Sequence, residues 1–303
     1  MRILHVTSSY LPHRSGVTIA IEGWVRALRA AGHHVSIWTV GTGDEDAGVF
    51  ASPGFGAISD GFPFPLSISA PRPVRGQEWD VVHTHHPLLI GQGAVRFARS
   101  RGAILAATAH SDYLAYLDAY FPPFAWILRP LVRWRIRRIF DACDVIFAPS
   151  ASIERALESW GVAEKVVPAT YPVDASALRR ASRTEARREL DLPLDLPLAL
   201  YAGRLATEKR VIELLEEFGR TLEAVPDAQL VIAGDGPIAT RVRRAAQVHG
   251  GSVMLTGELS TDQLGAWYSA ADVFVSASLN EVGPLVSIEA GLCGTPTVAR
   301  KAP

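Results

Sequence analysis

The sequence predicts an α/β protein made of two doubly wound domains. Its strands read as short runs rich in Val and Ile without polar alternation, which is typical of parallel strands covered on both faces. Amphipathic helical stretches separate these runs, as the crossovers between parallel strands require. The alternation breaks once, at a Pro-rich stretch, and then restarts. With 303 residues, the chain is long enough for two domains of common size.

The first domain is predicted over residues 1–170. Its expected strands are 3–6, 34–40, 80–83, 104–108 and 145–147. A helix is expected over 16–31, and Gly32 follows it in the usual C-terminal glycine position. The first six residues read as a buried strand rather than a signal peptide, because no apolar segment with a cleavage site follows them.

Residues 171–197 combine prolines with a charged helical stretch at 179–190, which predicts a linker. The second domain is then expected over 198–303. Its predicted strands are 198–202, 229–233, 253–256, 273–275 and 297–299. Its predicted helices are 211–224, 241–249, 261–270 and 285–293. In doubly wound sheets, ligands bind beyond the carboxyl ends of the strands, so the loops there are the candidate site.

Composition excludes several classes of protein. A net charge of -1 provides no basic excess for nucleic-acid binding, so no nucleic-acid partner is expected. Cys143 and Cys293 are far apart and lack metal-ligand spacing, which argues against a disulfide framework or zinc site and favours a reducing, cytoplasmic compartment. No run of about 18 uncharged apolar residues occurs, so no membrane-spanning helix is expected.

Two polar features follow strands of the first domain. Gly16 opens the first helix, where backbone N–H groups can approach a phosphate, but the surrounding residues lack the G-x-G-x-x-G pattern of dinucleotide sites.

Histidines 83, 85 and 86 cluster at a strand end, yet consecutive residues point in different directions and no carboxylate completes a metal shell. His110 follows the next strand, which suits either a polar contact to a reacting group or a packed, capping role.

The segment 124–140 is basic and rich in tryptophan. An apolar stripe is expected at Leu128, Val132, Ile136 and Phe140, beside a row of arginines at 129, 133 and 137. Basic amphipathic helices with aromatic residues lie on anionic bilayer surfaces, which is one interpretation. The other is a domain helix whose stripe is buried and whose arginines are solvated.

The second half contains two cations and two carboxylates at strand ends. Arg204 and Lys209 flank a short loop and suit a diphosphate, Arg as a bidentate donor and Lys as a point charge. Glu281 and Glu289 frame the start of a helix and could accept hydrogen bonds from sugar hydroxyls. A glycosidase pair of carboxylates and an ordinary surface acid with a helical Glu both remain open at this point.

Four segments together resemble the retaining nucleotide-sugar glycosyltransferases with the glycosyltransferase B fold, of the group 1 or family 4 type. They are Tyr10-Leu11-Pro12 through Gly16, Gly203-Arg204-Leu205 through Arg210, Gly234-Asp235-Gly236-Pro237, and Glu281 through Glu289 followed by Ala-Gly-Leu-Cys-Gly-Thr-Pro. Their order along the chain matches the family. The resemblance implies two Rossmann-like domains facing across a cleft.

The resemblance also implies roles for individual residues. Gly16, Gly236, Gly283, Leu285 and Val286 would lie against the nucleotide diphosphate sugar. Arg204 and Lys209 would neutralise the departing diphosphate. Glu289 would bind the ribose, Glu281 the transferred sugar, and His110 the sugar or the reacting oxygens. No metal and no cofactor besides the donor substrate would be needed, and retention would follow a front-face route without a side-chain nucleophile.

Within the family, residues 80–91 and 113–120 look like those of members that glycosylate diacylglycerol or phosphatidylinositol lipids, and hydrophilic acceptors stay open. A hydroxyl acceptor, a lipid among the candidates, and a peripheral position on the inner face of the membrane are therefore expected. Pro284 departs from the family pattern and lacks an N–H. The family continues beyond the point that corresponds to residue 303, so an incomplete second domain is expected. Two alternatives follow: a sugar-nucleotide epimerase or hydrolase, or an inactive, truncated nucleotide-sugar-binding protein.

Overall fold

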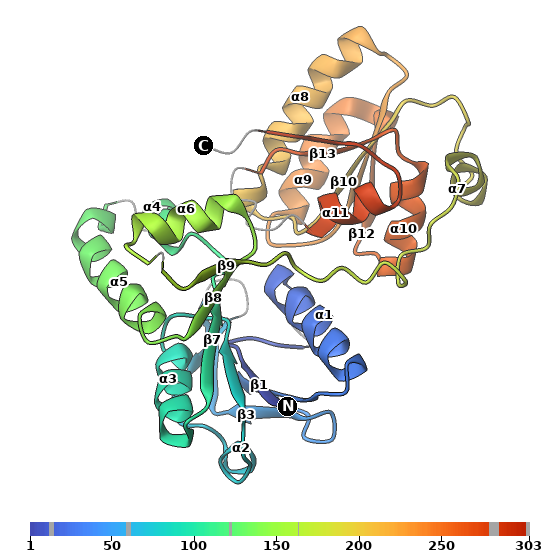
Figure 1. The fold of residues 1–303 in the computed structure, drawn as a ribbon. Helices are drawn as coiled ribbons and strands as arrows, with labels where there is room; N and C mark the ends of the chain where they lie inside the picture. The colour runs from blue at the N-terminus through green and yellow to red at the C-terminus, as the bar shows by residue number, and fades with distance from the viewer. Residues whose placement is uncertain (12–14, 59–61, 121–122, 163, 279–284, 301–303) are drawn as a thin grey trace. The chain divides into compact units, whose positions relative to one another are not determined.

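The computed structural model describes residues 1–303 except 12–14, 59–61, 121–122, 163, 279–284 and 301–303 (Figure 1). The chain divides into two compact units, 1–172 and 173–303, and each contains a parallel sheet. The prediction of an α/β fold with two Rossmann-like units is confirmed.

The first unit is built on a seven-stranded parallel sheet in the order β3-β2-β1-β6-β7-β8-β9. Its strands are β1 (Arg2–Val6), β2 (His34–Val40), β3 (Val49–Ser52), β6 (Val81–Thr84), β7 (Ile104–Thr108), β8 (Val145–Ala148) and β9 (Val166–Pro168). The chain moves outward from β1 to β3 and then returns to add β6 on the other side of β1. This reversal between β1 and β6 is the switch point at which doubly wound sheets open a ligand site. His5 and His83 are paired in register there.

Helices cover both faces of this sheet, with α1 on one face and α3 and α5 on the other (Figure 1). The helices are α1 (Gly16–Ala30), α2 (Arg72–Arg75), α3 (Ile90–Arg101), α4 (Tyr113–Tyr120), α5 (Ala125–Phe140) and α6 (Ala151–Ser159). Ser15 starts α1 by accepting the backbone N–H of Thr18 on its hydroxyl. Gly32 has a φ of 82° directly after the helix, so its predicted capping role is confirmed.

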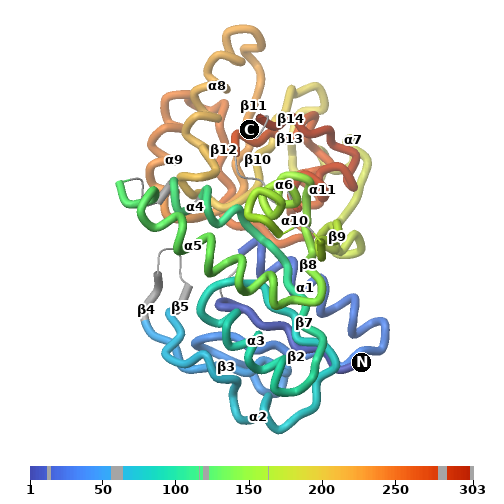
Figure 2. Tube along the Cα trace, turned by 60° about the vertical axis from the view of Figure 1, so that its left-hand side comes forward, coloured from blue at the N-terminus to red at the C-terminus, as the bar shows by residue number. Residues whose placement is uncertain are grey.

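The elements between β2 and β6 were not predicted from the sequence. β3 is only four residues long, and β4 (Gly54–Ile58) pairs antiparallel with β5 (Phe62–Pro65) in a hairpin outside the main sheet (Figure 2). Gly and Pro in these strands mask the periodicity by which strands are recognised. β9 was also missed, because three residues carry too little pattern.

The second unit contains a five-stranded parallel sheet in the order β12-β11-β10-β13-β14. Its strands are β10 (Leu198–Ala202), β11 (Gln229–Ala233), β12 (Val253–Gly257), β13 (Val273–Ser276) and β14 (Thr297–Ala299). Its α-helices are α7 (Arg183–Glu189), α8 (Val211–Ala224), α9 (Ala239–Ala246), α10 (Thr261–Ala270) and α11 (Leu285–Leu292). Thr207–Lys209 and Gln247–Ser252 form 3₁₀ turns.

Alternate residues of the central strand β10 face two separate cores. Leu198, Leu200 and Ala202 pack with residues of α7, α10 and α11, whereas Tyr201 packs with residues of α8 and α9. A strand that is buried on both faces reads as a continuous apolar run, which is why β10 and β11 were predicted at their observed bounds.

Most of the stretch interpreted as a linker belongs to the second unit. Ser182 and Glu185 form a capping box that starts α7, and Leu178 and Ala186 are buried in the core beside α10. The buried Arg187 side chain, only 3% exposed, donates to the Ala270 carbonyl at 3.0 Å and pairs with an aspartate of the second unit. These contacts make the segment an integral layer of the unit, which its charge and proline content concealed.

Close backbone contacts join the loops that follow β10 and β11. The Gly203 N–H donates to the Ala233 carbonyl at 2.9 Å, and the Leu205 N–H donates to the Asp235 carbonyl at 2.9 Å. A Cβ on Gly234 would lie 2.0 Å from the Gly203 carbonyl oxygen, and its φ of +143° also favours glycine. Only a residue without a side chain permits this approach.

Gly234→Ala should therefore destabilise the second unit by about 3 kcal/mol or more, because the backbone of both loops must move apart. Urea unfolding measures the loss. Gly251→Ala is the matched control, since a methyl group at Gly251 would meet nothing within 4 Å. Equal stability of the two variants would contradict the close-packing argument.

Candidate functional site

The cations predicted to bind a diphosphate lie in the loop that follows β10. Gly203 follows the strand, Arg204 comes next, and Lys209 is the last residue of the 3₁₀ turn before α8. Arg210 adopts a left-handed φ of 53° at the start of α8. Its guanidinium pairs with Glu213 at 3.0 Å. A side-chain hydrogen bond holds the loop backbone, because the Tyr201 hydroxyl donates to the Arg204 carbonyl at 3.1 Å.

Gly236 lies in the neighbouring loop, after β11. A Cβ at this position would lie 2.5 Å from the Leu205 carbonyl oxygen, and its φ of +158° favours glycine. The Ile238 N–H in turn donates to that same carbonyl at 3.1 Å. The predicted donor-binding Gly236 is thus packed directly against the loop that bears Arg204.

The third predicted element is the start of α11. Leu285 is buried in its first turn, Val286 is half-buried, and Glu289 lies one turn further on. The predicted residues Glu281 and Gly283 lie outside the described residues. β10 and β13 are adjacent and parallel, so the loop after β10 and the segment leading into α11 leave the same edge of the sheet. Topology therefore places the cation loop and the start of α11 beyond the same edge of the sheet.

Glu289 has a partner that was not predicted from the sequence. The Tyr268 hydroxyl, on α10, donates to the Glu289 carboxylate at 3.0 Å. Burial raises the pKa of Glu289 above its usual value, and the hydrogen bond from Tyr268 opposes that rise. A half-buried carboxylate held by one donor keeps its other oxygen available to accept a hydrogen bond from a ligand hydroxyl.

In the first unit, Gly16 is exposed at the first position of α1, and a methyl group there would meet nothing within 4 Å.

His110 is only 5% exposed, and both of its ring nitrogens have partners. Its Nε2 lies 2.8 Å from Nδ1 of His85, and its Nδ1 lies 2.7 Å from the Tyr171 hydroxyl. Tyr171 also stacks on the His110 ring, with centroids 5.4 Å apart. A ligand hydroxyl that is to reach His110 Nδ1 must take the place of the Tyr171 hydroxyl.

The histidine cluster differs from the one considered in the sequence. His5, His83 and His85 bring ring nitrogens within 4.8 Å of one another, whereas His86 instead accepts the Ser8 N–H on Nδ1 at 3.2 Å. His83 and His85 are two residues apart and so share a face of the strand, and the register pairs His5 with His83. The period of two relates His83 to His85, whereas His5 follows only from the pairing of β1 with β6.

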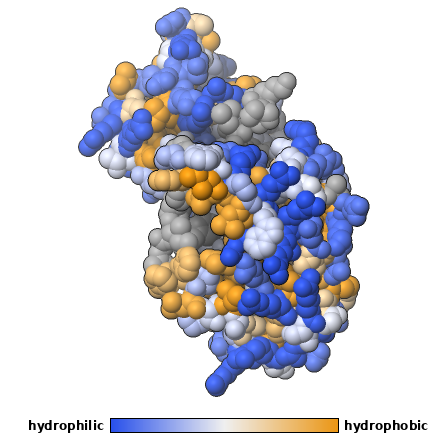
Figure 3. All heavy atoms as spheres, turned by 90° about the vertical axis from the view of Figure 1, so that its left-hand side faces the viewer, coloured by the Kyte–Doolittle hydropathy of each residue, from blue (hydrophilic) through white to orange (hydrophobic). Residues whose placement is uncertain are grey.

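The basic helix α5 is exposed over much of its length. Ile136 and Phe140 of the predicted stripe are buried, but Leu128 is 36% exposed, so burial of the whole stripe is wrong. The exposed large apolar side chains at this helix are Phe124, Trp126, Ile127, Leu128, Leu131 and Trp134. Figure 3 turns the side that bears α3 and α5 toward the viewer and shows hydrophobic and hydrophilic side chains interspersed. Apart from Ala125, the buried residues of α5 are Ile136, Ile139 and Phe140, all in its C-terminal half.

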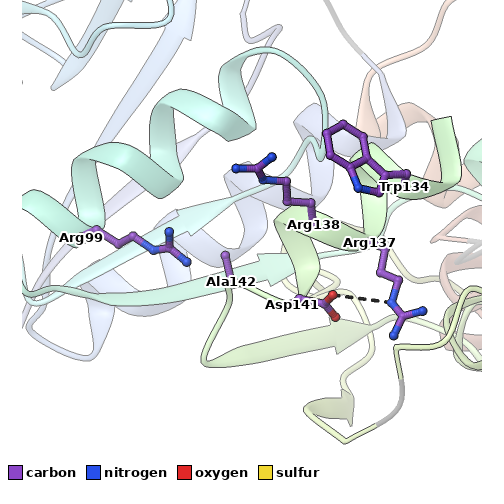
Figure 4. Close-up of a pocket in the computed structure, with 6 residues that line it drawn as sticks. All are labelled: Arg99, Trp134, Arg137, Arg138, Asp141 and Ala142. Atoms are coloured by element: carbon purple, nitrogen blue, oxygen red, sulfur yellow. Dashed lines mark ion pairs between the residues drawn. The ribbon is translucent and has the colours of Figure 1, made fainter. Parts of the chain in front are cut away.

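A pocket of about 420 Å³ lies where α5 meets the C-terminal end of α3. Figure 4 shows its lining residues, which are Arg99, Trp134, Arg137, Arg138, Asp141 and Ala142. Arg137 pairs with Asp141 at 3.5 Å, and the Arg138 guanidinium lies over the Trp134 ring at 5.4 Å. Three guanidinium groups and one carboxylate give the pocket a positive balance.

Comparisons with known proteins agree with this geometry. The family model described as Glycosyl transferases group 1 matches residues 182–303, and the one described as Glycosyltransferase Family 4 matches residues 14–176. The two models together cover most of both units. The chain belongs to the group 1 glycosyltransferases of family 4 type, and it is a glycosyltransferase. The resemblance read from the four motifs is confirmed.

Two curated relatives and one solved structure illustrate the match. The chain is 27% identical to the alpha-monoglucosyldiacylglycerol synthase of Streptococcus pneumoniae, over 100% of this chain and 72% of that protein. It is 30% identical to a GDP-mannose-dependent alpha-mannosyltransferase of Mycolicibacterium smegmatis, over 99% of this chain and 79% of that protein. Sucrose-phosphate synthase from Thermosynechococcus elongatus shares the fold with a TM-score of 0.75 at 22% identity, covering 98% of this chain and 80% of that one.

Acid should destabilise the first unit. Burial lowers the pKa of His5 to about 3 and that of His86 to about 4, and it lowers the pKa values of His83, His85 and His110 well below 6.5. Below pH 6.5 the unfolded chain therefore binds protons that the folded unit does not, so the free energy of unfolding falls as pH falls, by about 1.4 kcal/mol per pH unit for each proton.

Hydrogen exchange of peptides from β1 and β6 between pH 7.5 and 5, corrected for intrinsic rates, measures this slope. His86→Asn keeps an acceptor for the Ser8 N–H and should reduce the slope by about one proton. Stability of the unit that does not change between pH 7 and pH 5 would contradict the argument.

Proposed function

We propose that this glycosyltransferase moves a hexose from a nucleoside diphosphate sugar to a hydroxyl acceptor with retention of anomeric configuration and without a metal ion. The proposal depends on one observation: adjacent parallel strands bring the Arg204–Lys209 loop and the carboxylate-bearing helix α11 to the same edge of one sheet. A departing nucleoside diphosphate gains negative charge, and fixed cations stabilise that charge as it develops.

The donor roles follow from this arrangement. Arg204 and Lys209 bind the diphosphate, and the start of α11 directs backbone N–H groups from Leu285 and Val286 toward it. Glu289 accepts hydrogen bonds from the ribose hydroxyls with the carboxylate oxygen that Tyr268 leaves available. Gly16 provides the close backbone approach on the first unit, and His110 contacts the transferred sugar. Glu281 and Gly283 complete the donor set by their positions in the sequence motif.

Retention and metal independence have separate support. Both relatives described above are named for alpha-linked products, and a nucleotide-linked hexose of alpha configuration gives such a product by retention. Two permanent side-chain cations supply the charge that a divalent ion would otherwise supply. The transfer assay is therefore expected to proceed in the presence of a chelator, and proton coupling constants of the product should report the same anomer as the donor.

Lys209→Ala should weaken nucleotide binding by about 10- to 100-fold, the effect of losing a hydrogen bond to a charged group. Calorimetry with UDP and with GDP measures the affinity and shows which base is preferred. Arg220→Ala is the control, because Arg220 is an exposed cation of the same unit that pairs with Glu217 on α8. Unchanged affinity in the Lys209 variant would contradict the assignment of the donor site. Donor consumption without any acceptor would instead indicate an epimerase or hydrolase.

The acceptor proposed is a membrane lipid, and α5 is proposed to hold the enzyme on an anionic bilayer. The support is the combination of exposed apolar side chains, Trp126 at 74% and Leu131 at 54% exposure, with the positive pocket of Figure 4. Apolar side chains insert at the headgroup boundary while the arginines pair with lipid phosphates. No described helix is both long and apolar enough to cross a membrane. The lipid-acting relative named above favours the same acceptor class.

The protein should co-sediment with vesicles that contain phosphatidylglycerol, and added salt should weaken binding because exposed charges are screened. Arg133→Gln should lower vesicle affinity about fivefold, matching roughly 1 kcal/mol per basic residue. Leu131→Ser should lower vesicle affinity at low and at high salt, because the contribution of Leu131 to binding is apolar and is not screened. Arg220→Gln in the second unit is the charge-matched control. Absence of binding to anionic vesicles would remove the membrane proposal and leave the donor proposal intact.

A further inference from the structure

Four side chains of the first unit form one continuous chain of hydrogen bonds. Nδ1 of His5 lies 2.8 Å from Nε2 of His85, and Nδ1 of His85 lies 2.8 Å from Nε2 of His110. Nδ1 of His110 lies 2.7 Å from the Tyr171 hydroxyl. His5 belongs to β1, while His85 and His110 follow β6 and β7, so the chain crosses the switch point of the sheet. Both ring nitrogens of His85 and of His110 are used within it.

All three histidine rings are neutral at pH 7. They are at most 5% exposed, and burial lowers each of their pKa values far below 6.5. The ionisable groups that face His85 and His110 are His5, His83, His86 and Tyr171. None of these is a carboxylate, so nothing in this set stabilises an imidazolium. A neutral imidazole has one N–H and one lone pair, and each ring therefore donates in one direction and accepts from the other.

The tautomers of the three rings are consequently coupled. If His110 donates from Nε2, then His85 must accept on Nδ1 and donate from Nε2, and His5 must accept on Nδ1. The opposite sense reverses all three rings together. A single ring cannot change its tautomer without leaving two donors or two lone pairs facing each other, which costs about 1–3 kcal/mol for each buried group left unpaired.

The number of unpaired groups decides in which direction the hydrogen bonds are donated along the chain. Nε2 of His5 is buried and has no hydrogen-bond partner among the described residues, so it is unpaired in either sense. When Tyr171 donates to Nδ1 of His110, every other nitrogen and oxygen of these four side chains is paired. In the reverse sense the Tyr171 O–H also needs an acceptor, and its only hydrogen bond within the described part of the chain is the one to His110. The first sense leaves one group unpaired and the second leaves two.

The geometry points to His85 as a positioning residue that, anchored by His5, fixes the orientation and tautomer of His110 and presents the Nδ1 lone pair of His110 to a sugar hydroxyl at the place that the Tyr171 hydroxyl occupies. This inference rests on the role proposed above for His110. It adds His85, His5 and Tyr171 to the residues on which that role depends. No proton leaves the chain in this arrangement: His110 accepts a hydrogen bond and does not become charged.

A neutral orienting partner has a different effect from a carboxylate. A carboxylate bonded to the far nitrogen of a histidine orients the ring and also stabilises its charged form. His85 orients His110 and provides no such charge. His110 then acts as a hydrogen-bond acceptor beside the sugar and does not place a positive charge there, which leaves the cations of the second unit as the main stabilisers of the departing diphosphate.

The alternative use of this cluster is a metal site formed by His5, His83 and His85. That site would require a nitrogen of His85, and both are already hydrogen-bonded, to His5 and to His110. Nε2 of His83 is likewise bonded, to the Thr108 hydroxyl at 2.8 Å. Binding a metal would break the chain that orients His110, so the observed hydrogen bonds favour the chain.

The tautomer is tested directly by ¹⁵N NMR of protein labelled at histidine, with His110→Gln used to assign the signals. The expected result is an unprotonated Nδ1 and a protonated Nε2 in His110, unchanged between pH 8 and pH 6. A protonated Nδ1, or a titration of His110 in this range, would overturn the inference. So would a stoichiometric metal found by elemental analysis of the purified protein, if removing that metal changes the ¹⁵N signals of His110.

A matched pair of substitutions tests the positioning role. An Asn amide lies where Nδ1 of a histidine lies, and a Gln amide lies near Nε2. His85→Asn therefore keeps the contact with His110 and loses the one with His5, whereas His85→Gln keeps His5 and loses His110. His83→Gln is the control, because it replaces a buried histidine of the same strand that is outside the chain and keeps the contact with Thr108.

His85→Gln should lower kcat for hexose transfer by about 100-fold, the loss expected when a reacting contact is misplaced by about 1 Å, while KM for the donor changes little. His85→Asn should recover most of that loss, and His83→Gln should match the wild type. Equal kcat values for the Asn and Gln variants would overturn the inference, provided that circular dichroism shows both to be folded. If the wild type transfers no hexose at all, the proposed function fails, and the NMR result still decides whether the histidine chain exists as described.

Discussion

The predicted donor site in the second unit depends on the close approach of two backbone loops. The carbonyl of Gly203 occupies the space that a side chain at Gly234 would need, and the carbonyl of Leu205 does the same at Gly236. These contacts bring the ends of β10 and β11 together and fix the backbone from which Arg204 projects. A cation can stabilise a developing charge only if it is held in place before the reaction, because reorganising it during the reaction would cost part of the gain. On the proposed function, Gly234 and Gly236 are therefore needed to hold Arg204 in place for the diphosphate, as well as to form the turns.

Buried polar side chains with named partners occur among the predicted site residues of each unit. In the second unit Glu289 is held by Tyr268, and in the first unit His110 is held by His85 and Tyr171. Burying such groups is unfavourable unless each is hydrogen-bonded, so a protein selected for stability alone would gain by replacing them with apolar residues. On the proposed function, Glu289 and His110 are kept for the hydrogen bonds that they offer to a ligand.

The fold was largely predictable from the sequence because the central strands of both sheets are buried on both faces. Buried strands such as β7, β10 and β11 are largely apolar in sequence. These three strands, β2 and the exposed β14 were predicted at their observed bounds. The failures have physical causes. The β4–β5 hairpin contains Gly and Pro, β9 is three residues long, and the capping box of α7 lies in a charged stretch that resembles a linker. For the site, the motifs identified the residues that bear charge. They did not identify Tyr171, Tyr268 or His5, because a partner across a fold leaves no trace in local spacing, although strand register makes His5 a neighbour of His83 once the order of strands is known.

The predicted site residues of the two units differ in charge. The second unit contributes permanent cations and a carboxylate, while the buried polar groups at the switch point of the first unit are all neutral at pH 7. The proposed transfer would create positive character on the sugar and negative charge on the diphosphate at the same time. An imidazolium beside the sugar would oppose the first of these, whereas a cation beside the diphosphate favours the second. In the role proposed for His110, desolvated histidines that have only neutral partners would provide hydrogen bonds to the sugar without charge. The low pKa values of these histidines, which lower the stability of the unit in acid, are on this argument a consequence of the same requirement.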